Sequence, residues 1–144
     1  KAFPKIIRKA SGFGIGIVSE KVIDKVGIQK AVKKEMKLAI RNMESKFNLK
    51  TSYLIVDGSK TIPLRKNNVK RIIRGGLYHY SIAASSVLAK VTRDKIMVSL
   101  AKKFPSYGFE RHVGYGTKMH FKALKKYGAS PIHRKSFAPI KTMF

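Results

Sequence analysis

The chain has 144 residues, 44% of them hydrophobic, and carries 32 basic against 7 acidic residues, a formal net charge of +25 at pH 7. This apolar content excludes a disordered basic tail, and no apolar run approaches the roughly 20 residues that cross a bilayer. Such a charge favours a polyanionic partner, above all nucleic acid, over a membrane surface or an acidic protein. Without cysteine the chain has no disulfide or thiolate metal site, and without a secretory segment we expect a cytoplasmic protein.

The first half of the chain predicts one long helix between short strands. In residues 12–19, GFGIGIVS, bulky residues and glycines alternate, which predicts a strand whose bare face lets another backbone approach closely. Apolar residues three and four positions apart predict an amphipathic helix from about Gly27 onward. A β-branched run within 51–60 predicts a second strand, and 68–76 predicts a third that stops at glycines.

The second half predicts helices. Ser81 is the expected N-cap of a helix over about 82–104, which Pro105 ends. The remaining segments are expected to be a loop, a helix and an extended tail, at 105–116, 117–127 and 128–140. Strands and helices in this order predict an α/β sheet domain.

Two acidic residues stand out in so basic a chain. Asp57 follows four apolar residues at the carboxyl end of a predicted strand, where open α/β sheets bind ligands, but Asp57-Gly58 is also ordinary turn chemistry. Asp94 lies inside the predicted helix, where it either pairs with Lys90 or takes part in chemistry. Both acids together could bind one Mg²⁺, which takes oxygen ligands. The residues alone leave these alternatives open.

Five segments, in order along the chain, resemble the ribonuclease HII family, the type 2 ribonucleases H. They are FGIGIVSEKVID, YLIVDG, SIAASSVLAKVTRDKIM, YGFERHVGYGTKMHFKALKKYG and SPIHRKSFAPI, and they extend from about residue 12 to residue 140. The resemblance implies a ribonuclease H-like mixed sheet flanked by helices, in one domain with its core at about 12–104 and a helical and extended region at about 105–144. It implies an endoribonuclease that acts on the RNA strand of RNA–DNA hybrids and at ribonucleotides embedded in duplex DNA.

The resemblance also implies a site. In that family four carboxylates hold two divalent cations, Mn²⁺ or Mg²⁺, which activate water and stabilise the leaving oxygen. Two of the four carboxylates map onto Asp57 and Asp94. The tyrosine that packs on the sugar at the RNA–DNA junction maps onto Tyr115. Phosphate contacts are expected from the basic residues Lys90, Arg93, Lys118 and Arg134.

The sequence departs from the family pattern in two places. The Asp-Glu-x-Gly-Arg-Gly element that carries the other two carboxylates does not occur, and Gly76 stands where the family usually has a further acid. We therefore expect the carboxyl-terminal portion of a ribonuclease HII, monomeric, incomplete at the amino-terminal strands of the sheet, and inactive alone. An open reading frame upstream of Lys1 that encodes the element would support this expectation.

The alternative function is a non-catalytic basic nucleic-acid-binding protein, which suits the charge and size equally well. It gives no reason, however, for the placement of the two acids. The histidines show no spacing typical of zinc ligands. His112 and His133 lie in the family-like segments, where we expect a structural or substrate-contacting role.

Overall fold

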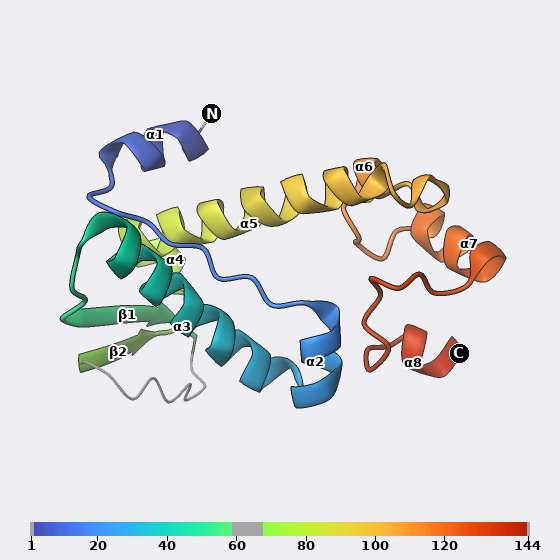
Figure 1. The fold of residues 1–144 in the computed structure, drawn as a ribbon, viewed down its shortest axis with the longest axis horizontal. Helices are drawn as coiled ribbons and strands as arrows, with labels where there is room; N and C mark the ends of the chain where they lie inside the picture. Colours follow the sequence, from blue (N-terminus) through green and yellow to red (C-terminus); the bar gives the residue numbers. More distant parts are fainter. Residues whose placement is uncertain (1, 59–67, 144) are drawn as a thin grey trace. The chain divides into compact units, whose positions relative to one another are not determined.

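The computed structural model of the protein describes residues 2–58 and 68–143. The chain divides into two compact units, Lys1–Ala89 and Lys90–Phe144, which we describe separately; the single domain stays a prediction. The described residues are mostly helical with one small sheet, which confirms the α/β fold class (Figure 1). None of their helices is long and apolar enough to cross a bilayer.

The sheet belongs to the first unit. This unit contains, in chain order, α1 (Ala2–Lys9), α2 (Glu20–Val26), α3 (Ile28–Phe47), β1 (Tyr53–Asp57), β2 (Asn68–Ile72), α4 (Gly75–Tyr78) and the beginning of α5 (Tyr80–Ala101). The helix predicted from Gly27 and both later strands are confirmed. β1 and β2 run parallel, with Asp57 opposite Ile72. The Gly58 N–H extends the ladder by donating to the Ile72 carbonyl at 3.0 Å, so the carboxyl ends of both strands lie together.

The strand predicted for residues 12–19 is wrong. The segment pairs with no strand in the described residues, and it packs instead on α3. A Cβ atom at Gly14 would collide with the carbonyl oxygen of Ala39, so the bare face does meet another backbone closely. The Asn42 side-chain amide donates to the Ile15 carbonyl at 2.8 Å and satisfies a group that a neighbouring strand would otherwise bind.

The predicted N-cap Ser81 is also wrong, because α5 begins at Tyr80, two residues earlier than predicted. His79 has an extended conformation, and its carbonyl accepts the N–H of Ala83 at 3.1 Å, which puts His79 in the N-cap position. The other end of α5 agrees with the sequence to within three residues. The Phe104 N–H still donates to the Leu100 carbonyl at 3.0 Å before Pro105 stops the helix.

The second unit begins within α5, at Lys90, and is helical. It contains η1 (Pro105–Tyr107), α6 (Phe109–His112), α7 (Lys118–Tyr127) and α8 (Ile140–Met143). The predicted helix at 117–127 is confirmed, with the Thr117 hydroxyl accepting the His120 N–H at 3.2 Å as its N-cap. The predicted loop contains two short helical turns, and turns and α8 replace part of the predicted extended tail.

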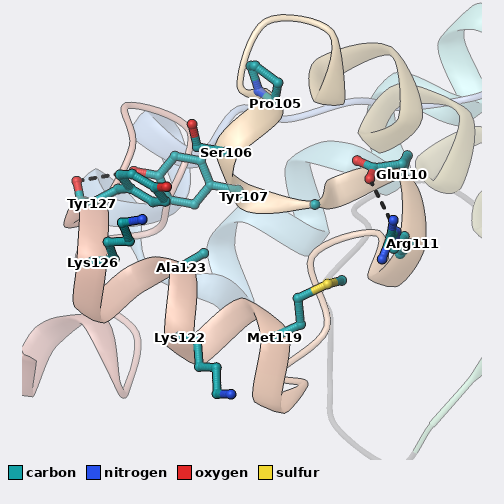
Figure 2. Close-up of a pocket in the computed structure, with 11 residues that line it drawn as sticks. Pro105, Ser106, Tyr107, Glu110, Arg111, Met119, Lys122, Ala123, Lys126 and Tyr127 are labelled. Carbon is teal, nitrogen blue, oxygen red and sulfur yellow. Dashed lines mark hydrogen bonds and ion pairs between the residues drawn. The ribbon is translucent and has the colours of Figure 1, made fainter.

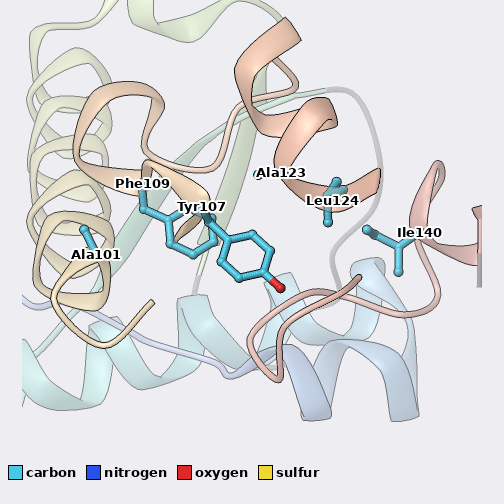
Figure 3. Close-up of a cluster of buried hydrophobic side chains, with 6 residues drawn as sticks. All are labelled: Ala101, Tyr107, Phe109, Ala123, Leu124 and Ile140. Atoms are coloured by element: carbon cyan, nitrogen blue, oxygen red, sulfur yellow. The ribbon is translucent and has the colours of Figure 1, made fainter. Parts of the chain in front are cut away.

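Phe109 lies at the centre of the hydrophobic core of this unit, with 1% of its surface exposed. Its ring stacks on that of Tyr107, with ring centres 5.4 Å apart. Burying one such side chain stabilises a fold by roughly 2–3 kcal/mol. The core joins α5, η1, α6, α7 and α8 through six buried residues: Ala101, Tyr107, Phe109, Ala123, Leu124 and Ile140 (Figure 3). It therefore fixes the ends of the loop between α6 and α7.

Candidate functional site

Asp57 lies where the sequence predicts it, exposed at the carboxyl end of β1. Its Oδ1 accepts a hydrogen bond from the backbone N–H of Gly75 at 2.9 Å. Gly75 is the first residue of α4, so the carboxylate satisfies an amide at the beginning of a helix. Asp57 therefore links the end of β1 to the turn after β2.

Asp94 lies between two bases on α5. Its Oδ2 is 2.6 Å from Lys90 Nζ, and its Oδ1 is 3.3 Å from Arg93 Nη1. The hydrogen bond from Lys90 holds the pKa of Asp94 below its usual range, and the same bond raises the pKa of Lys90. The pair is solvent-exposed and contributes little to stability. The salt bridge that the sequence left as one alternative is therefore present, and it keeps the Asp94 carboxylate ionised.

Tyr115 joins this group through Arg93. The guanidinium carbon of Arg93 lies 4.8 Å from the centre of the Tyr115 ring, a cation–π contact, while 53% of the tyrosine stays exposed. The structure thus brings together Asp94, Lys90, Arg93 and Tyr115, all predicted site residues, in the second unit. The two cations and the accessible aromatic face are chemically suited to a sugar–phosphate backbone. The ionised carboxylate of Asp94 would repel phosphate and is suited to binding a cation.

The backbone just before Tyr115 is strained. Val113 has the left-handed conformation at φ +42°, which is rare for a β-branched residue, and Gly114 follows at φ +82°. Such strain is stable only where surrounding contacts hold it, and it gathers at functional sites. Here the Tyr115 N–H donates to the His112 carbonyl at 2.8 Å, and the Thr117 N–H donates to the Tyr115 carbonyl at 2.8 Å.

The other two predicted phosphate contacts are exposed residues elsewhere in the second unit. Lys118 is the first residue of α7. The guanidinium of Arg134 stacks on the ring of Phe137 at 3.9 Å. Their contact with phosphate stays a prediction.

Sequence reasoning missed a cluster of His112, His120, His133 and Ser130. The rings of His112 and His120 stack with centres 4.5 Å apart, and the Nε2 atoms of His120 and His133 are 3.0 Å apart. These residues come from α6, α7 and the segment after α7, so no helix or strand period connects them. Among the described residues, no group of three or more histidine or acidic side chains could hold a metal ion. The packing around His112 and His133 is compatible with the structural role, one of the two roles expected for them.

A cavity of about 340 Å³ lies elsewhere in the second unit, between η1 and α7 (Figure 2). Arg111, Lys122 and Lys126 give it a basic lining, but Arg111 is 3.7 Å from Glu110 and partly neutralised. None of the predicted site residues lines this cavity. The predicted site residues therefore lie in two separate places, the group around Tyr115 in the second unit and Asp57 in the first.

The two acids fit divalent cations in donor type but not in number. Carboxylate oxygens are the ligands that Mg²⁺ prefers. Both oxygens of Asp94 are bound by bases, and two carboxylates cannot neutralise two divalent cations. Asp57 belongs to the first unit and Asp94 to the second, so their convergence on one cation stays a prediction.

The chain matches known proteins along almost all of its length. The family model described as Ribonuclease HII matches residues 3–140. A ribonuclease HII of Acetivibrio thermocellus is 48% identical over 139 residues, which are 95% of this chain and 52% of that protein. Ribonucleases HII of Bacillus thuringiensis and Bacillus cereus are 44% identical over 142 residues, 98% of this chain and 52% of each relative. The chain therefore spans about half the length of these relatives, and it belongs to the ribonuclease HII family.

Proposed function

We propose that this chain is the carboxyl-terminal portion of a ribonuclease HII that hydrolyses RNA in RNA–DNA hybrids and cuts at ribonucleotides embedded in duplex DNA. The observation that carries the proposal is the position of Arg93, which contacts both the Asp94 carboxylate and the Tyr115 ring. In a chain of this family, that contact joins an acid, a base and an exposed aromatic ring in one group. A protein that only attracts polyanions has no need of the acid or the ring.

Each residue of the group has a role in the proposal. Tyr115 packs on a sugar of the substrate, and Lys90, Arg93, Lys118 and Arg134 contact phosphates. Asp57 and Asp94 provide two of the ligands for divalent cations, Mn²⁺ or Mg²⁺. When bound, the cations would activate a water molecule and stabilise the leaving oxygen. Base–aromatic stacking contributes about 1–3 kcal/mol per base in single-strand binding, and we expect the packing of Tyr115 on a sugar to contribute near the lower end of that range.

Binding and hydrolysis of the substrate depend on different groups of this chain. The 144 residues retain the aromatic and basic groups, so they bind a hybrid duplex, but with two of the four family carboxylates they do not cleave it. The proposal further includes a monomeric, cytoplasmic protein, and sedimentation equilibrium of the purified chain tests the oligomeric state.

Replacing Tyr115 with alanine tests the proposal. We expect Tyr115→Ala to weaken binding of a fluorescently labelled RNA–DNA hybrid about tenfold, measured by anisotropy at fixed salt, since one stacking contact is lost. Tyr53→Ala is the matched control, because Tyr53 is also 53% exposed but begins β1. Its affinity for the hybrid should equal that of the unchanged chain.

Two results would contradict the proposal. Equal affinities of Tyr115→Ala and Tyr53→Ala would favour the alternative, a non-catalytic basic nucleic-acid-binding protein. Cleavage of the hybrid by the purified 144 residues in Mn²⁺, abolished by Asp57→Asn, would show that the two remaining acids suffice for hydrolysis.

A further inference from the structure

The carbonyl oxygen of Tyr115 accepts two hydrogen bonds. One comes from the Thr117 N–H at 2.8 Å, and the other involves His120 Nδ1 at 3.0 Å. Because a carbonyl only accepts, Nδ1 of His120 must carry the proton. In the neutral ring, Nε2 of His120 is then an acceptor.

The neighbouring ring supplies the matching donor. Nε2 of His133 lies 3.0 Å from Nε2 of His120. The other nitrogen of His133, Nδ1, faces the Ser130 N–H at 3.0 Å and the Ser130 hydroxyl at 2.7 Å. Because the N–H only donates, Nδ1 of His133 is an acceptor and Nε2 carries the proton. The bonds therefore run in one direction, from Ser130 through His133 and His120 to the Tyr115 carbonyl.

The surroundings favour neutral rings. Ser130 is 4% exposed and His120 6% exposed, and the Phe109 ring lies 5.6 Å from that of His120. The titratable groups that face the two histidines are His112 of α6, stacked on His120, and Tyr107 of η1, whose ring is 5.4 Å from that of His133.

The hydrogen bonds of His112 show which of its ring nitrogens accepts and which donates. Its Nδ1 accepts the Gly114 N–H at 3.1 Å, so its Nε2 donates to the Tyr107 carbonyl at 2.8 Å.

We propose that Ser130, His133 and His120 form a neutral hydrogen-bond relay that positions Tyr115, and that protonation of the relay weakens nucleic-acid binding. His120 and His133 are thus positioning residues that act through the tyrosine. This inference rests on the proposed role of Tyr115 in contacting the sugar.

The direction of the pH effect follows from the bonds. A second proton on His120 would sit on Nε2 and face the N–H of His133. A second proton on His133 would sit on Nδ1 and face the N–H of Ser130, so in each case two donors would meet and the hydrogen bond would be lost. Burial lowers the pKa of His120 and of His133, and the neighbouring histidines lower both further. The unfolded chain therefore takes up protons first, as the pH falls through the ordinary value of 6.5. The contribution of the relay to stability is complete above that pH and is lost below it, toward the folded-state pKa.

Binding of the labelled hybrid at about pH 7.5 and about pH 5.5 tests the inference, because the relay and the added positive charge of protonated histidines predict opposite changes in affinity. Protonation adds positive charge and should strengthen attraction to phosphate, whereas loss of the relay should weaken binding. We expect the unchanged chain and the control His79→Gln, an exposed histidine outside the cluster, to bind about two- to fourfold more weakly in acid, because the lowered pKa leaves the relay only partly protonated at that pH. His133→Gln keeps an N–H donor but does not titrate, so most of the acid effect should disappear. Equal weakening in His133→Gln and His79→Gln would overturn the inference.

Nitrogen-15 NMR of the histidine rings in the unchanged chain provides a readout that does not depend on function or on a folded variant. We expect the proton on Nδ1 of His120 and on Nε2 of His133 above neutral pH, and a shift of the Tyr115 amide signal as either ring titrates. A proton on Nε2 of His120, or an unmoved Tyr115 signal, would overturn the relay. If the rings are as assigned while Tyr115→Ala binds normally, the proposed function fails and the relay stands.

Discussion

The carboxylates of Asp57 and Asp94 are held in place by different kinds of partner. Asp57 accepts one backbone amide, whose position the sheet and α4 fix, whereas Asp94 binds two long basic side chains that are largely in water. A backbone donor keeps its place when solvent or salt changes, but exposed ion pairs exchange readily with other cations. At the scale of single residues, Asp57 is the better-fixed acid and Asp94 the more easily rearranged one.

The two glycines that begin α4 differ in the space around them, which leads to a prediction. A Cβ at Gly75 would lie 2.5 Å from Ile82 Cδ1, whereas one at Gly76 would have no atom within 4 Å. We expect Gly75→Ala to reduce the free energy of unfolding by about 1 kcal/mol, the lower end of overpacking costs, because Cδ1 is the end of a flexible side chain. Gly76→Ala should leave it unchanged or raise it slightly.

Urea unfolding followed by circular dichroism measures both variants. Equal free energies of unfolding for the two would show that the turn after β2 adapts freely, and that Gly75 does not fix the amide that binds Asp57.

At the scale of elements, the alternating glycines of residues 12–19 are compatible with packing against either a strand or a helix. Alternating glycines give a flat face that accepts either a strand or a helix, and the sequence does not say which. α3 covers that face at Gly14 and Gly16. At one end of the segment the ring of Phe13 also lies against that of Phe47, with ring centres 5.5 Å apart. The contact of the two glycines with α3 is between backbones, so it tolerates little added volume.

Replacing Gly14 with alanine should therefore be costly. The added Cβ would meet the carbonyl oxygen of Ala39 and lie 2.7 Å from the backbone nitrogen of Met43, and a helix backbone cannot move aside as a side chain can. We expect Gly14→Ala to lower the free energy of unfolding by about 3 kcal/mol, against about 1 kcal/mol for Gly75→Ala. Unfolding in urea measures both, and a Gly14→Ala chain as stable as the unchanged one would show that the segment does not pack on α3.

At the scale of the whole molecule, the net charge of +25 dominates the interaction with any polyanion. Each phosphate that a basic residue neutralises releases counterions, so affinity falls with salt in proportion to the number of such contacts. Charge alone does not distinguish the residues that touch phosphate from those that only raise the field. The salt dependence of binding makes that distinction.

We expect replacement of Lys90, Lys118 and Arg134 by alanine to reduce the slope of log affinity against log salt by roughly 2–3, about 0.9 for each lost phosphate contact. A matched variant with alanine at Lys30, Lys34 and Lys37, exposed residues of α3, loses the same charge and should keep a slope close to the original. Titrations of the labelled hybrid at several salt concentrations measure both slopes. Identical slopes in the two variants would remove these three residues from the phosphate contacts.

Local patterns along the chain were enough to predict the long helices, the strand that ends at Asp57 and the membership of the family. Each of these depends on residues that are near one another along the chain or on motifs in a fixed order. The sequence also predicted the residues grouped around Arg93, because Lys90, Arg93 and Asp94 share one helix and Tyr115 lies in a family motif.

Contacts between separate elements establish three further features: which neighbour covers residues 12–19, where α5 begins, and how Ser130, His133 and His120 connect to Tyr115. These features depend on groups that come from different elements and meet only after the chain has folded. The physical reason is that a backbone face or an imidazole nitrogen acquires its role from its partner, and neither periodicity nor spacing specifies a partner from another element.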